Sequence, residues 1–373
     1  MPPVYYHQNK FPPSDLDLQR LLPLVGPANA GLARYDGILS AIPNANVLLA
    51  PLTTQEAVLS SRIEGTQATL GEVLEFEAGK EALSEEKKAD IHEVLNYRLA
   101  LQNAVKQMET LPLSQRLIKG AHSVLMQGVR GRNKAPGEYR RVPNWIGPAG
   151  CTIETARFVP PGAEKVPDAM SAWERYLHAD APDKLVQLAI LHAEFEAIHP
   201  FLDGNGRLGR LLIPLYLVDK KLLSTPNFYI SAYFEARRDE YYDRLLAVSR
   251  DNDWTGWCVF FLTAIVEQSR SNHSKAKAIL DLYQEKKLWI TELTHSQYAI
   301  RALDWFFSRP VFKSSDFYTS SGVPVPTARN ILKKLTNNSM FSILRPGSGR
   351  SPAVLMFSQL IGITEGIEII DRI

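Results

Sequence analysis

The sequence predicts a mainly α-helical protein that carries a β-hairpin near its middle and a small α/β domain at its C-terminal end. Apolar residues recur at helical spacing over most of the first 295 residues. Glycine and proline break this pattern between residues 136 and 161, where short extended stretches flank a turn. Beyond residue 295, three short helical segments precede two short strands. A chain of 373 residues is long enough for roughly two or three domains.

The composition indicates a water-soluble globular protein, with 45% hydrophobic and 22% charged residues. No stretch approaches the roughly 18 uninterrupted apolar residues of a membrane span. The first residues lack the apolar core and the cleavage site of a signal peptide. We therefore expect a cytoplasmic protein with no membrane partner. The two cysteines, Cys151 and Cys258, have no cysteine or histidine at metal-ligand spacing, so we expect neither a disulfide framework nor a zinc site.

The N-terminal region is predicted to consist of packing helices. Apolar residues follow helical spacing at 16–24 and again at 32–42. Thr53 and Glu56 then have the spacing of a capping box, so a helix is predicted to begin at Thr53 and to end at Gly65.

Glu64 stands at the predicted C-terminal end of that helix, where the negative end of the helix dipole disfavours an anion. A nearby cation would compensate for this, although a solvated glutamate is an equally good interpretation of the position alone. Thr69 and Glu72 repeat the capping-box spacing and predict the start of the next helix.

Two further helices with apolar stripes are predicted between residues 90 and 130. We expect His92 and His122, which lie in them, to be surface or core histidines rather than ligands.

The most distinctive stretch runs from residue 192 to 210, where a glycine-rich turn separates two apolar helices. Gly204 and Gly206 allow positive φ and the close approach of a ligand to the backbone. The unpaired N–H groups that begin the second helix favour an anion, and phosphate is the usual one. Arg207 and Arg210 add planar guanidinium groups that suit phosphate oxygens. The turn therefore predicts a phosphate site, and a helix–turn–helix with charged surface residues is the alternative.

Two other side chains of this turn extend the prediction from binding to chemistry. Phosphate would repel Asp203 unless a hard cation lay between them, so we expect Asp203 to bind Mg²⁺ together with phosphate oxygens. His199 has an imidazole that accepts a proton near neutral pH, which suits a general base beside a phosphate group.

The run His-Pro-Phe-Leu-Asp-Gly-Asn-Gly-Arg-Leu-Gly-Arg at 199–210 resembles the Fic family signature HPFxxGNGRxxR at every specified position. The resemblance implies a Fic-type helical bundle with a β-hairpin flap. It also implies transfer of AMP from ATP to a Tyr, Thr or Ser hydroxyl of a target protein. His199 would then deprotonate the hydroxyl, and Asp203 would hold Mg²⁺. The nucleotide-binding residues that the resemblance implies in this run are Gly204, Asn205, Gly206, Arg207 and Arg210.

A second motif, Ser60-Ser-Arg-Ile-Glu64-Gly65, resembles the inhibitory motif (S/T)xxxE(G/N) of Fic proteins. The resemblance implies that Glu64 pairs with Arg210 and keeps the γ-phosphate of ATP out of its productive place. Ser60 lies one helical turn earlier and would face the same site. Inhibition would act within one chain, or between subunits if homodimers form. Glu64 is also a candidate for aligning water in the removal of AMP, and the sequence does not decide this.

The turn-rich segment from 136 to 161 is expected to form a β-hairpin at an edge, where an extended target segment could be added as a strand. By resemblance this is the Fic flap, which positions the target hydroxyl, and Val159 and Pro160 are candidates for touching the nucleotide. A plain loop is the alternative. Tyr242 falls where Fic relatives place a tyrosine near the adenine, although half-buried packing would also explain it.

The C-terminal segment is basic. Between residues 296 and 359 eight lysines and arginines face two aspartates, which gives a local charge of +6. Helices are predicted at 299–307, 315–320 and 327–335, and strands at 342–344 and 354–357. This order resembles a winged helix with residues 326–335 as the recognition helix and 345–350 as the wing. Basic residues there would neutralise DNA phosphates, but winged helices also serve in dimerisation and protein docking.

The predicted domains are an N-terminal helical region (1–100) with the inhibitory motif, a Fic core (101–270), a helical connector (271–295) and a winged-helix domain (296–373). Two hypotheses of function follow. The first is an autoinhibited enzyme that uses ATP and Mg²⁺ to attach AMP to proteins, including itself. The second is a DNA-binding regulator whose Fic-like cleft senses a nucleotide. The target protein cannot be read from the sequence.

Overall fold

The computed structural model describes residues 2–82, 84–128, 134–148, 150–348 and 351–366. The chain divides into two compact units. The first unit comprises Met1–Asp36, Leu59–Thr66 and Leu95–Arg270, and the second comprises Gly37–Val58, Gln67–Val94 and Ser271–Ile373. The segments of the two units therefore alternate along the chain, whereas each predicted domain is one continuous stretch. Two parts of the predicted winged helix, residues 349–350 and 367–373, lie outside the described residues.

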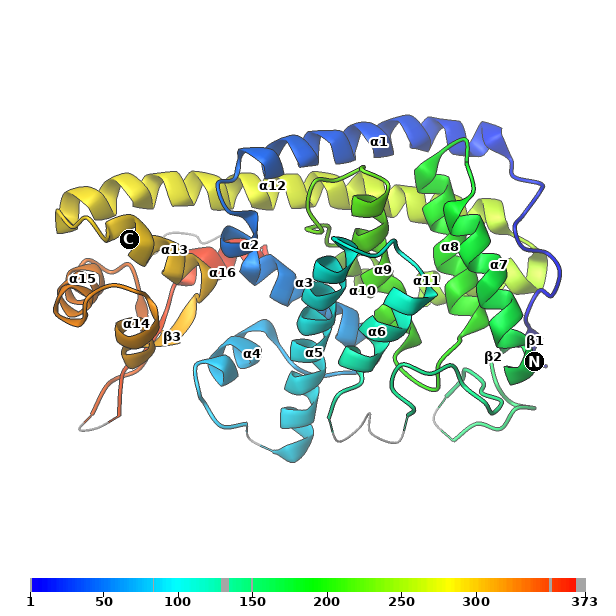
Figure 1. Cartoon of the computed structure of the whole chain (residues 1–373), viewed down its shortest axis with the longest axis horizontal. Coiled ribbons are helices and arrows are strands. Elements are labelled where there is room, and N and C mark those ends of the chain that lie inside the picture. Colours follow the sequence, from blue (N-terminus) through cyan, green and yellow to red (C-terminus); the bar gives the residue numbers. More distant parts are fainter. Residues whose placement is uncertain (1, 83, 129–133, 149, 349–350, 367–373) are drawn as a thin grey trace. The chain divides into compact units, whose positions relative to one another are not determined.

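The described part of the chain is mainly α-helical (Figure 1), which confirms the predicted fold class. Its first elements are β1 (Val4–Tyr5), α1 (Leu18–Ala41), α2 (Ala45–Leu48), α3 (Ala50–Ile63), α4 (Leu70–Glu77), α5 (Glu85–Met108) and α6 (Gln115–Leu125). The next are β2 (Phe158–Val159), the 3-10 helix η1 (Ala163–Lys165), α7 (Val166–His178), α8 (Lys184–Ile198), α9 (Asn205–Asp219), α10 (Ser231–Ala236) and α11 (Arg238–Asp251). The last are α12 (Trp254–Thr294), α13 (Ala299–Ser308), β3 (Val311–Lys313), α14 (Ser314–Ser320), α15 (Val325–Asn337), β4 (Ser342–Arg345), β5 (Val354–Met356) and α16 (Ser358–Glu365).

The N-terminal helices differ from the prediction at two points. The stretches 16–24 and 32–42 belong largely to the single helix α1, which contains Pro23 and Pro27. The capping box expected at Thr53 is wrong, because α3 has already begun at Ala50 and the Thr53 hydroxyl bonds to a carbonyl of the preceding turn. The stop at Gly65 is confirmed, since α3 ends at Ile63 and Gly65 has a φ of 103°.

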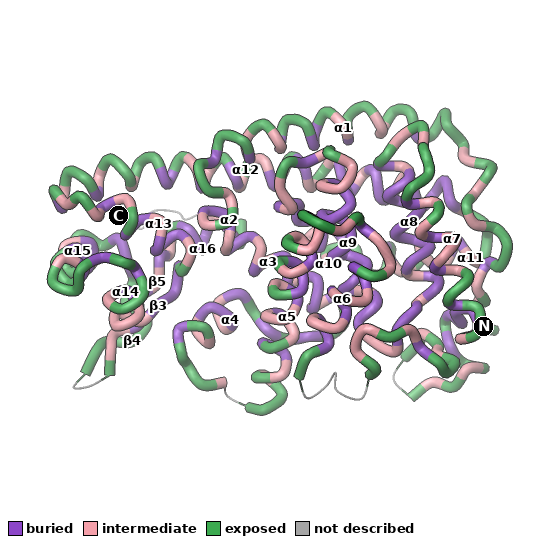
Figure 2. Tube along the Cα trace, in the orientation of Figure 1, coloured by how far each residue is buried: buried purple, intermediate pink, exposed green. Residues whose placement is uncertain are grey.

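Helices α8 and α9 form the centre of the first unit. Both are buried on nearly every face, as Figure 2 shows by their purple colour, and they pack against each other. A helix that is apolar all round belongs in a core rather than at a surface. Helix α7 packs on α8, and the indole N–H of Trp257 in α12 donates to the Ala189 carbonyl of α8 at 2.6 Å. The helix pair is thereby a rigid support for the turn that joins its members.

A strand that the sequence analysis missed completes the flap region. The hairpin expected at 136–161 is reduced to one bridge between Ile146 and Phe158. On its other side, β2 pairs in parallel with β1, the N-terminal strand Val4–Tyr5. One edge of β2 is therefore already occupied by the chain itself, which local periodicity could not reveal because the two strands are far apart in sequence.

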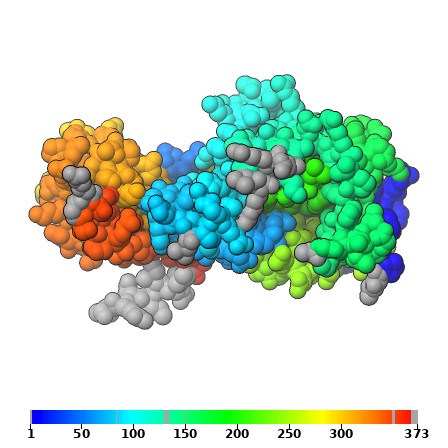
Figure 3. Space-filling view, turned by 90° about the horizontal axis from the view of Figure 1, so that it is seen from below, coloured from blue at the N-terminus to red at the C-terminus, as the bar shows by residue number. Residues whose placement is uncertain are grey.

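The second unit contains a three-stranded antiparallel sheet with the order β3-β5-β4, together with the helices α13, α14 and α15. The predicted helices and strands are present in this region, and β3 and α16 were not predicted. Helix α4 packs on this sheet through one apolar cluster, and Figure 3 shows the light-blue surface of α4 against the orange and red C-terminal surface. The cluster consists of Leu70, Leu74, Ala78, Val311, Val354, Met356 and Ile361.

The capping box at the start of α4 is confirmed, because Thr69 and Glu72 bond reciprocally. The predicted connector, residues 271–295, is the second part of the long helix α12. Among the described residues, no helix has the length and apolar character needed to cross a bilayer.

Candidate active site

The turn between α8 and α9 places the predicted site residues. Helix α8 ends at Ile198 because proline follows at 200, and His199 takes a left-handed conformation with a φ of 49°. Gly204, with a φ of 76°, begins α9, and within the described structure no side chain caps the first turn of that helix. The amide groups of this turn are therefore left for an external anion.

Asn205 and His122 hold the turn from two sides. The Asn205 side chain accepts from the Phe201 amide at 2.8 Å and donates to the Phe201 carbonyl at 2.9 Å, so its polar atoms support the loop. His122 donates from Nε2 to the Asp203 carbonyl, accepts at Nδ1 from the Gly137 amide, and stacks on Phe201 at 3.8 Å. Burial lowers the pKa of His122 to about 4. The turn is thus preorganised before any ligand binds.

Both predictions for non-ligand histidines agree with the described structure. His122 is a buried histidine with both ring nitrogens hydrogen-bonded, and His92 lies exposed with its ring against Phe76. Across the described ranges, no cluster of three or more His, Cys, Asp or Glu side chains has the arrangement of a metal site.

His199 has the tautomer that a general base needs. Its Nδ1 donates to the Glu196 carbonyl at 3.4 Å, because a carbonyl oxygen can only accept, and the lone pair therefore lies on Nε2. Burial lowers the pKa of His199 to about 4, against the opposing influence of the Glu196 carbonyl and of Glu64. The imidazole is therefore neutral at physiological pH.

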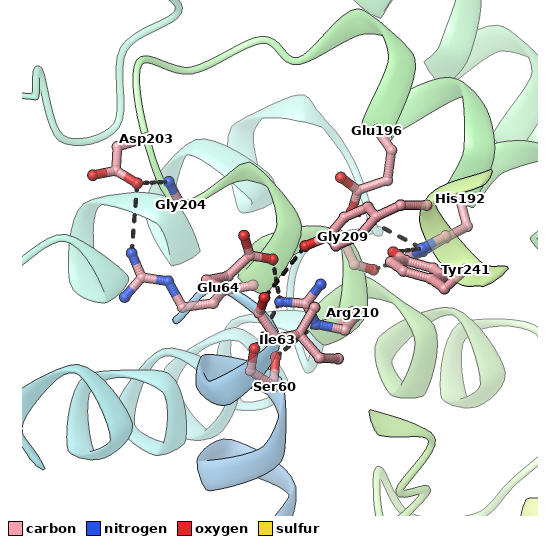
Figure 4. A network of polar contacts seen from close by, with 12 residues as sticks. Ser60, Ile63, Glu64, His192, Glu196, Asp203, Gly204, Gly209, Arg210 and Tyr241 are labelled. Atoms are coloured by element: carbon pink, nitrogen blue, oxygen red, sulfur yellow. Dashed lines mark hydrogen bonds and ion pairs between the residues drawn. The ribbon is translucent and has the colours of Figure 1, made fainter. Parts of the chain in front are cut away.

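Arg210 is held by the segment from Ser60 to Glu64, as Figure 4 shows. Its Nη2 donates to Glu64 Oε1 at 2.6 Å and to the Ser60 carbonyl at 2.8 Å, and its Nε donates to the Ser60 hydroxyl at 2.9 Å. The Arg210 side chain is fully buried and that of Glu64 is 34% exposed. Although burial opposes ionisation of Glu64, Arg210 holds its pKa below the usual value. The partner cation expected for Glu64 is therefore Arg210.

Asp203 and Arg207 stand at the mouth of the same turn. Asp203 Oδ1 accepts from the Gly204 amide at 2.6 Å and lies 3.7 Å from Arg207 Nη2. The Asp203 side chain is 45% exposed, whereas that of Arg207 is almost fully buried. A single half-exposed carboxylate fits Mg²⁺ that completes its shell with water and phosphate oxygens, and it does not form a metal cage by itself.

A pocket of ≈ 420 Å³ opens beside these groups. Tyr242 lines it, and its hydroxyl donates to the Ile63 carbonyl at 3.4 Å. From β2 the lining residue is Phe158, and the nucleotide contact of the neighbouring Val159 and Pro160 stays a prediction. Further lining residues, from α8, α9 and the ends of α3 and α8, are Glu64, Ala193, Glu196, Ala197, His199 and Gly206.

Two family models match the chain. The model described as Fic/DOC family N-terminal matches residues 22–106, and the model described as Fic/DOC family matches residues 112–217. Together they span about half of the chain. The chain belongs to the Fic/DOC family.

Relatives with curated names include a probable protein adenylyltransferase of Aquifex aeolicus (strain VF5), 31% identical over 199 residues, which are 50% of this chain and 55% of the relative. Protein adenylyltransferase Fic of Drosophila grimshawi is 28% identical over 196 residues, which are 48% of this chain and 37% of the relative. The chain thus matches only about half, or less, of the length of these relatives.

Solved structures share the fold. A Fic family protein from Desulfovibrio desulfuricans G20 aligns over 92% of this chain and 98% of its own, with a TM-score of 0.59 and 23% identity. A Fic domain containing signaling protein from Bacteroides thetaiotaomicron aligns over 67% of this chain and 97% of its own, with a TM-score of 0.53 and 19% identity. The Fic fold of the described chain is therefore established.

Arg140, which was not predicted from the sequence, ties the flap to the turn between α8 and α9. Its guanidinium donates to the carbonyls of His199, at 2.9 Å, of Ile198, at 3.3 Å, and of Pro161. The side chain is only 2% exposed, and burial lowers its pKa to about 10, so it stays charged at neutral pH. No local pattern distinguishes it from the exposed Arg141 beside it.

The analysis also missed Glu196, whose side chain lines the pocket one helical turn before His199. Its spacing of three residues from His199 on one helix was a usable signal.

Proposed function

We propose that this Fic chain is a protein adenylyltransferase that moves AMP from ATP to a hydroxyl side chain of a protein, including its own. The observation that carries the proposal is one pocket lined by a neutral His199, by Gly206 in the uncapped first turn of α9 and by Glu64, whose carboxylate accepts from Arg210. The names of the relatives from Aquifex and Drosophila support it.

His199 is the proposed general base. Its unprotonated Nε2 accepts the proton of the target hydroxyl while the hydroxyl oxygen attacks the α-phosphorus of ATP. A new bond forms between that oxygen and the phosphorus, the bond between the α- and β-phosphates breaks, and pyrophosphate leaves. Removal of such a base typically costs a factor of about 10² to 10⁴ in rate.

The start of α9 and its arginines are the proposed triphosphate site. The amide groups from Asn205 to Arg207 face an anion at the positive end of the helix dipole, and Arg210 receives the γ-phosphate once Glu64 has left. Asp203 would hold Mg²⁺, which supplies charge neutralisation of the phosphates when bound. We place the adenosine in the pocket beside Tyr242 and Phe158.

The flap is the proposed dock for the target. Because β1 lies on one side of β2 and Ile146 bridges to Phe158 on the other, an extended target segment would pair along the outer edge of the segment that contains Ile146. Val142 and Trp145, which are 53% and 42% exposed, flank this position and offer apolar contacts.

Glu64 is the proposed inhibitor, because it occupies the guanidinium that the γ-phosphate needs. We expect Glu64→Gly to raise incorporation of label from α-³²P-ATP with Mg²⁺ into the chain itself at least about tenfold. Glu138→Gly, a change at an exposed glutamate, is the matched control and should stay at the basal level. Glu64→Gly with His199→Ala should lose the label. Equal labelling of the Glu64→Gly chain and the unaltered chain would contradict the switch.

AMP removal by the same site is tested in parallel. The labelled Glu64→Gly chain is incubated with the unlabelled, unaltered chain, which retains both His199 and Glu64, and the release of AMP is measured. Release would support a second use of Glu64 in aligning water, and its absence would restrict the enzyme to transfer.

A second function, DNA binding through a winged helix in the second unit, is favoured by one observation. Helix α15 exposes Arg329, Asn330 and Lys333 and contains no acidic residue. We expect a fluorescent duplex to bind with an affinity that falls steeply as salt rises, and Arg329→Ala with Lys333→Ala to weaken it. If the Arg329→Ala, Lys333→Ala variant binds the duplex as tightly as the unaltered chain, dimerisation or protein docking is left as the role of this unit.

A further inference from the structure

Arg210 has a second carboxyl group beside it, that of Glu196 on α8. Figure 4 shows Glu196 and Gly209 next to the Glu64–Arg210 pair. The Glu196 side chain is 11% exposed, and its Oε1 is buried and accepts no hydrogen bond within the described part of the chain. Arg210 Nη1 is likewise buried without a hydrogen-bond partner among those residues. An acceptor and a donor therefore remain unused near one guanidinium.

The nearest histidine does not satisfy Glu196. His192 Nε2 lies 3.9 Å from Glu196 Oε1. His192 Nδ1 donates to the Gly209 carbonyl at 3.2 Å, and its Nε2 accepts from the Tyr241 hydroxyl at 2.9 Å. Burial lowers the pKa of His192 to about 3, so the ring is neutral and carries no proton toward Glu196. This contact is therefore not an ion pair.

Two glycines admit the two carboxyl groups to α9. A Cβ at Gly206 would lie 2.2 Å from Glu64 Oε1, and a Cβ at Gly209 would lie 2.2 Å from Glu196 Oε1. Glycine inside a helix is less favourable than alanine. Each glycine thus makes room for one carboxyl group beside Arg210.

The two carboxyl groups share one buried cation. Burial raises the pKa of Glu196 to about 8 in spite of Arg210, and the charge of Glu64 adds to the increase. The neutral form of Glu196 also agrees with an Oε1 that no donor reaches. The charged and titratable groups that face Glu196 or line the same pocket are Glu64 just after α3, His192 from α8, His199 just after α8, Arg210 from α9, Arg238, Tyr241 and Tyr242 from α11, and Arg157 before β2.

We propose that Glu196 is a positioning residue for Arg210, which in its neutral form leaves the guanidinium to the triphosphate and in its ionised form holds the guanidinium and repels the nucleotide. This rests on the proposed function, because it concerns the arginine that receives the γ-phosphate. It adds a second form of regulation to the site. Glu64 blocks Arg210 in the resting chain, and Glu196 limits nucleotide binding at alkaline pH.

The direction of the pH effect follows from the charges. When Glu64 is removed, the ionisation of Glu196 moves to lower pH, because a like charge has gone. A rise in pH then converts Glu196 to a carboxylate that opposes a bound triphosphate. Nucleotide affinity should therefore fall between pH 6 and 9, while the chemical step at His199, which is neutral throughout, should change little.

The test uses the full-length Glu64→Gly chain with and without Glu196→Gln. Calorimetry measures binding of a non-hydrolysable ATP analogue with Mg²⁺ at pH values from 6 to 9, and initial rates of self-labelling give KM and kcat over the same range. In the Glu64→Gly chain the Kd and the KM should rise roughly tenfold with pH, and kcat should stay within about twofold. With Glu196→Gln the Kd and the KM should be nearly independent of pH. Glu240→Gln, at an exposed glutamate of α11, is the matched control and should keep the full pH dependence.

A second variant guards against misfolding of Glu196→Gln. Gly209→Ala displaces the Glu196 carboxyl group by its added Cβ and should also flatten the pH dependence. An unchanged pH dependence of analogue binding in both folded variants overturns the proposal. If the analogue binds with the expected pH dependence and no AMP is transferred, the proposal for Glu196 stands and the proposed function fails.

Discussion

At the scale of residues, the site is built on three neutral histidines with defined tautomers. His122 supports the turn, His192 bonds Tyr241 and the Gly209 carbonyl, and His199 presents a free Nε2. Burial lowers the pKa of each, to about 4, about 3 and about 4 respectively. A buried imidazole that is neutral at rest keeps its hydrogen-bond roles fixed, which holds the Nε2 lone pair of His199 free for the proton of the hydroxyl.

The same histidines predict a loss of stability in acid. Above pH 6.5 they are neutral in both states, and below it only the unfolded chain binds protons, so the free energy of unfolding falls as pH drops toward 4. Each contributes about 2 kcal/mol of loss between pH 6.5 and 5. Because the pKa of Glu196 is raised to about 8, its contribution to the free energy of unfolding rises as pH falls from 8 to 4.5, which opposes the effect of the histidines.

Urea unfolding at pH 7 and pH 5 checks this prediction. His192→Gln should show a smaller loss between the two values than the unaltered chain. His178→Gln, at an exposed histidine, should show the full loss. If the two variants lose the same stability, buried His192 is not part of the effect.

At the scale of elements, the flap is held from two sides. On one side β1 pairs with β2, and the adjacent residues anchor on α8, where Glu194 accepts from the Tyr6 hydroxyl at 2.5 Å and from His7 Nε2 at 2.8 Å. On the other side, Arg140 bonds carbonyls of the flap and of the catalytic turn. The flap and the backbone of His199 are therefore linked through one guanidinium, and the proposed binding of a target at the flap would be coupled to the orientation of His199.

Replacement of Arg140 by lysine tests this link. A lysine keeps the charge and loses the planar fork, so carbonyls of His199 and Pro161 lose donors. In the Glu64→Gly chain we expect Arg140→Lys to lower AMP transfer at least about tenfold and to destabilise the fold by about 1–3 kcal/mol. Arg141→Lys, at the exposed neighbour, is the matched control. Transfer at the control rate would show that the fork is not needed.

At the scale of the whole molecule, the segment that carries Glu64 is flanked along the chain by two segments of the other unit. Leu59–Thr66 belongs to the first unit, while Gly37–Val58 before it and Gln67–Val94 after it belong to the second. Within the second unit α2 packs on α13, and α4 packs on β3 and β5. Both ends of the segment that carries Glu64 are thus anchored in the unit that contains the C-terminal domain.

A change inside the second unit should therefore alter inhibition. Leu74→Ala removes a buried contact of α4 with the sheet, and we expect it to raise AMP transfer several-fold in the chain with Glu64 and to have no effect in the Glu64→Gly chain. Leu303→Ala, at a buried residue of α13 outside this cluster, controls for general destabilisation. Thermal melting recorded for each variant confirms folding. An equal rise in both backgrounds would place the effect outside the Glu64 switch.

Much of the site was predictable because its residues are close in sequence. The glycines, arginines, aspartate and histidine that predict the chemistry of the turn all lie in one stretch from His199 to Arg210. The helices were predicted from apolar spacing. The start of α3 was misplaced because Thr53 and Glu56 have the spacing of a capping box, although Thr53 already lies inside the helix that begins at Ala50. The pairing of Glu64 with Arg210 was expected by resemblance, and its geometry agrees with that expectation.

By itself, the sequence determined the helical fold class and predicted an anion-binding turn with His199 as the base, because each depends on neighbours within a few residues. The tertiary structure alone decided that β1 pairs with β2, that Arg140 rather than Arg141 joins the flap to the turn, and that Glu196 stands beside Arg210. Strand pairing, burial and pKa depend on groups that the fold brings together from distant parts of the chain. No local pattern contains that information.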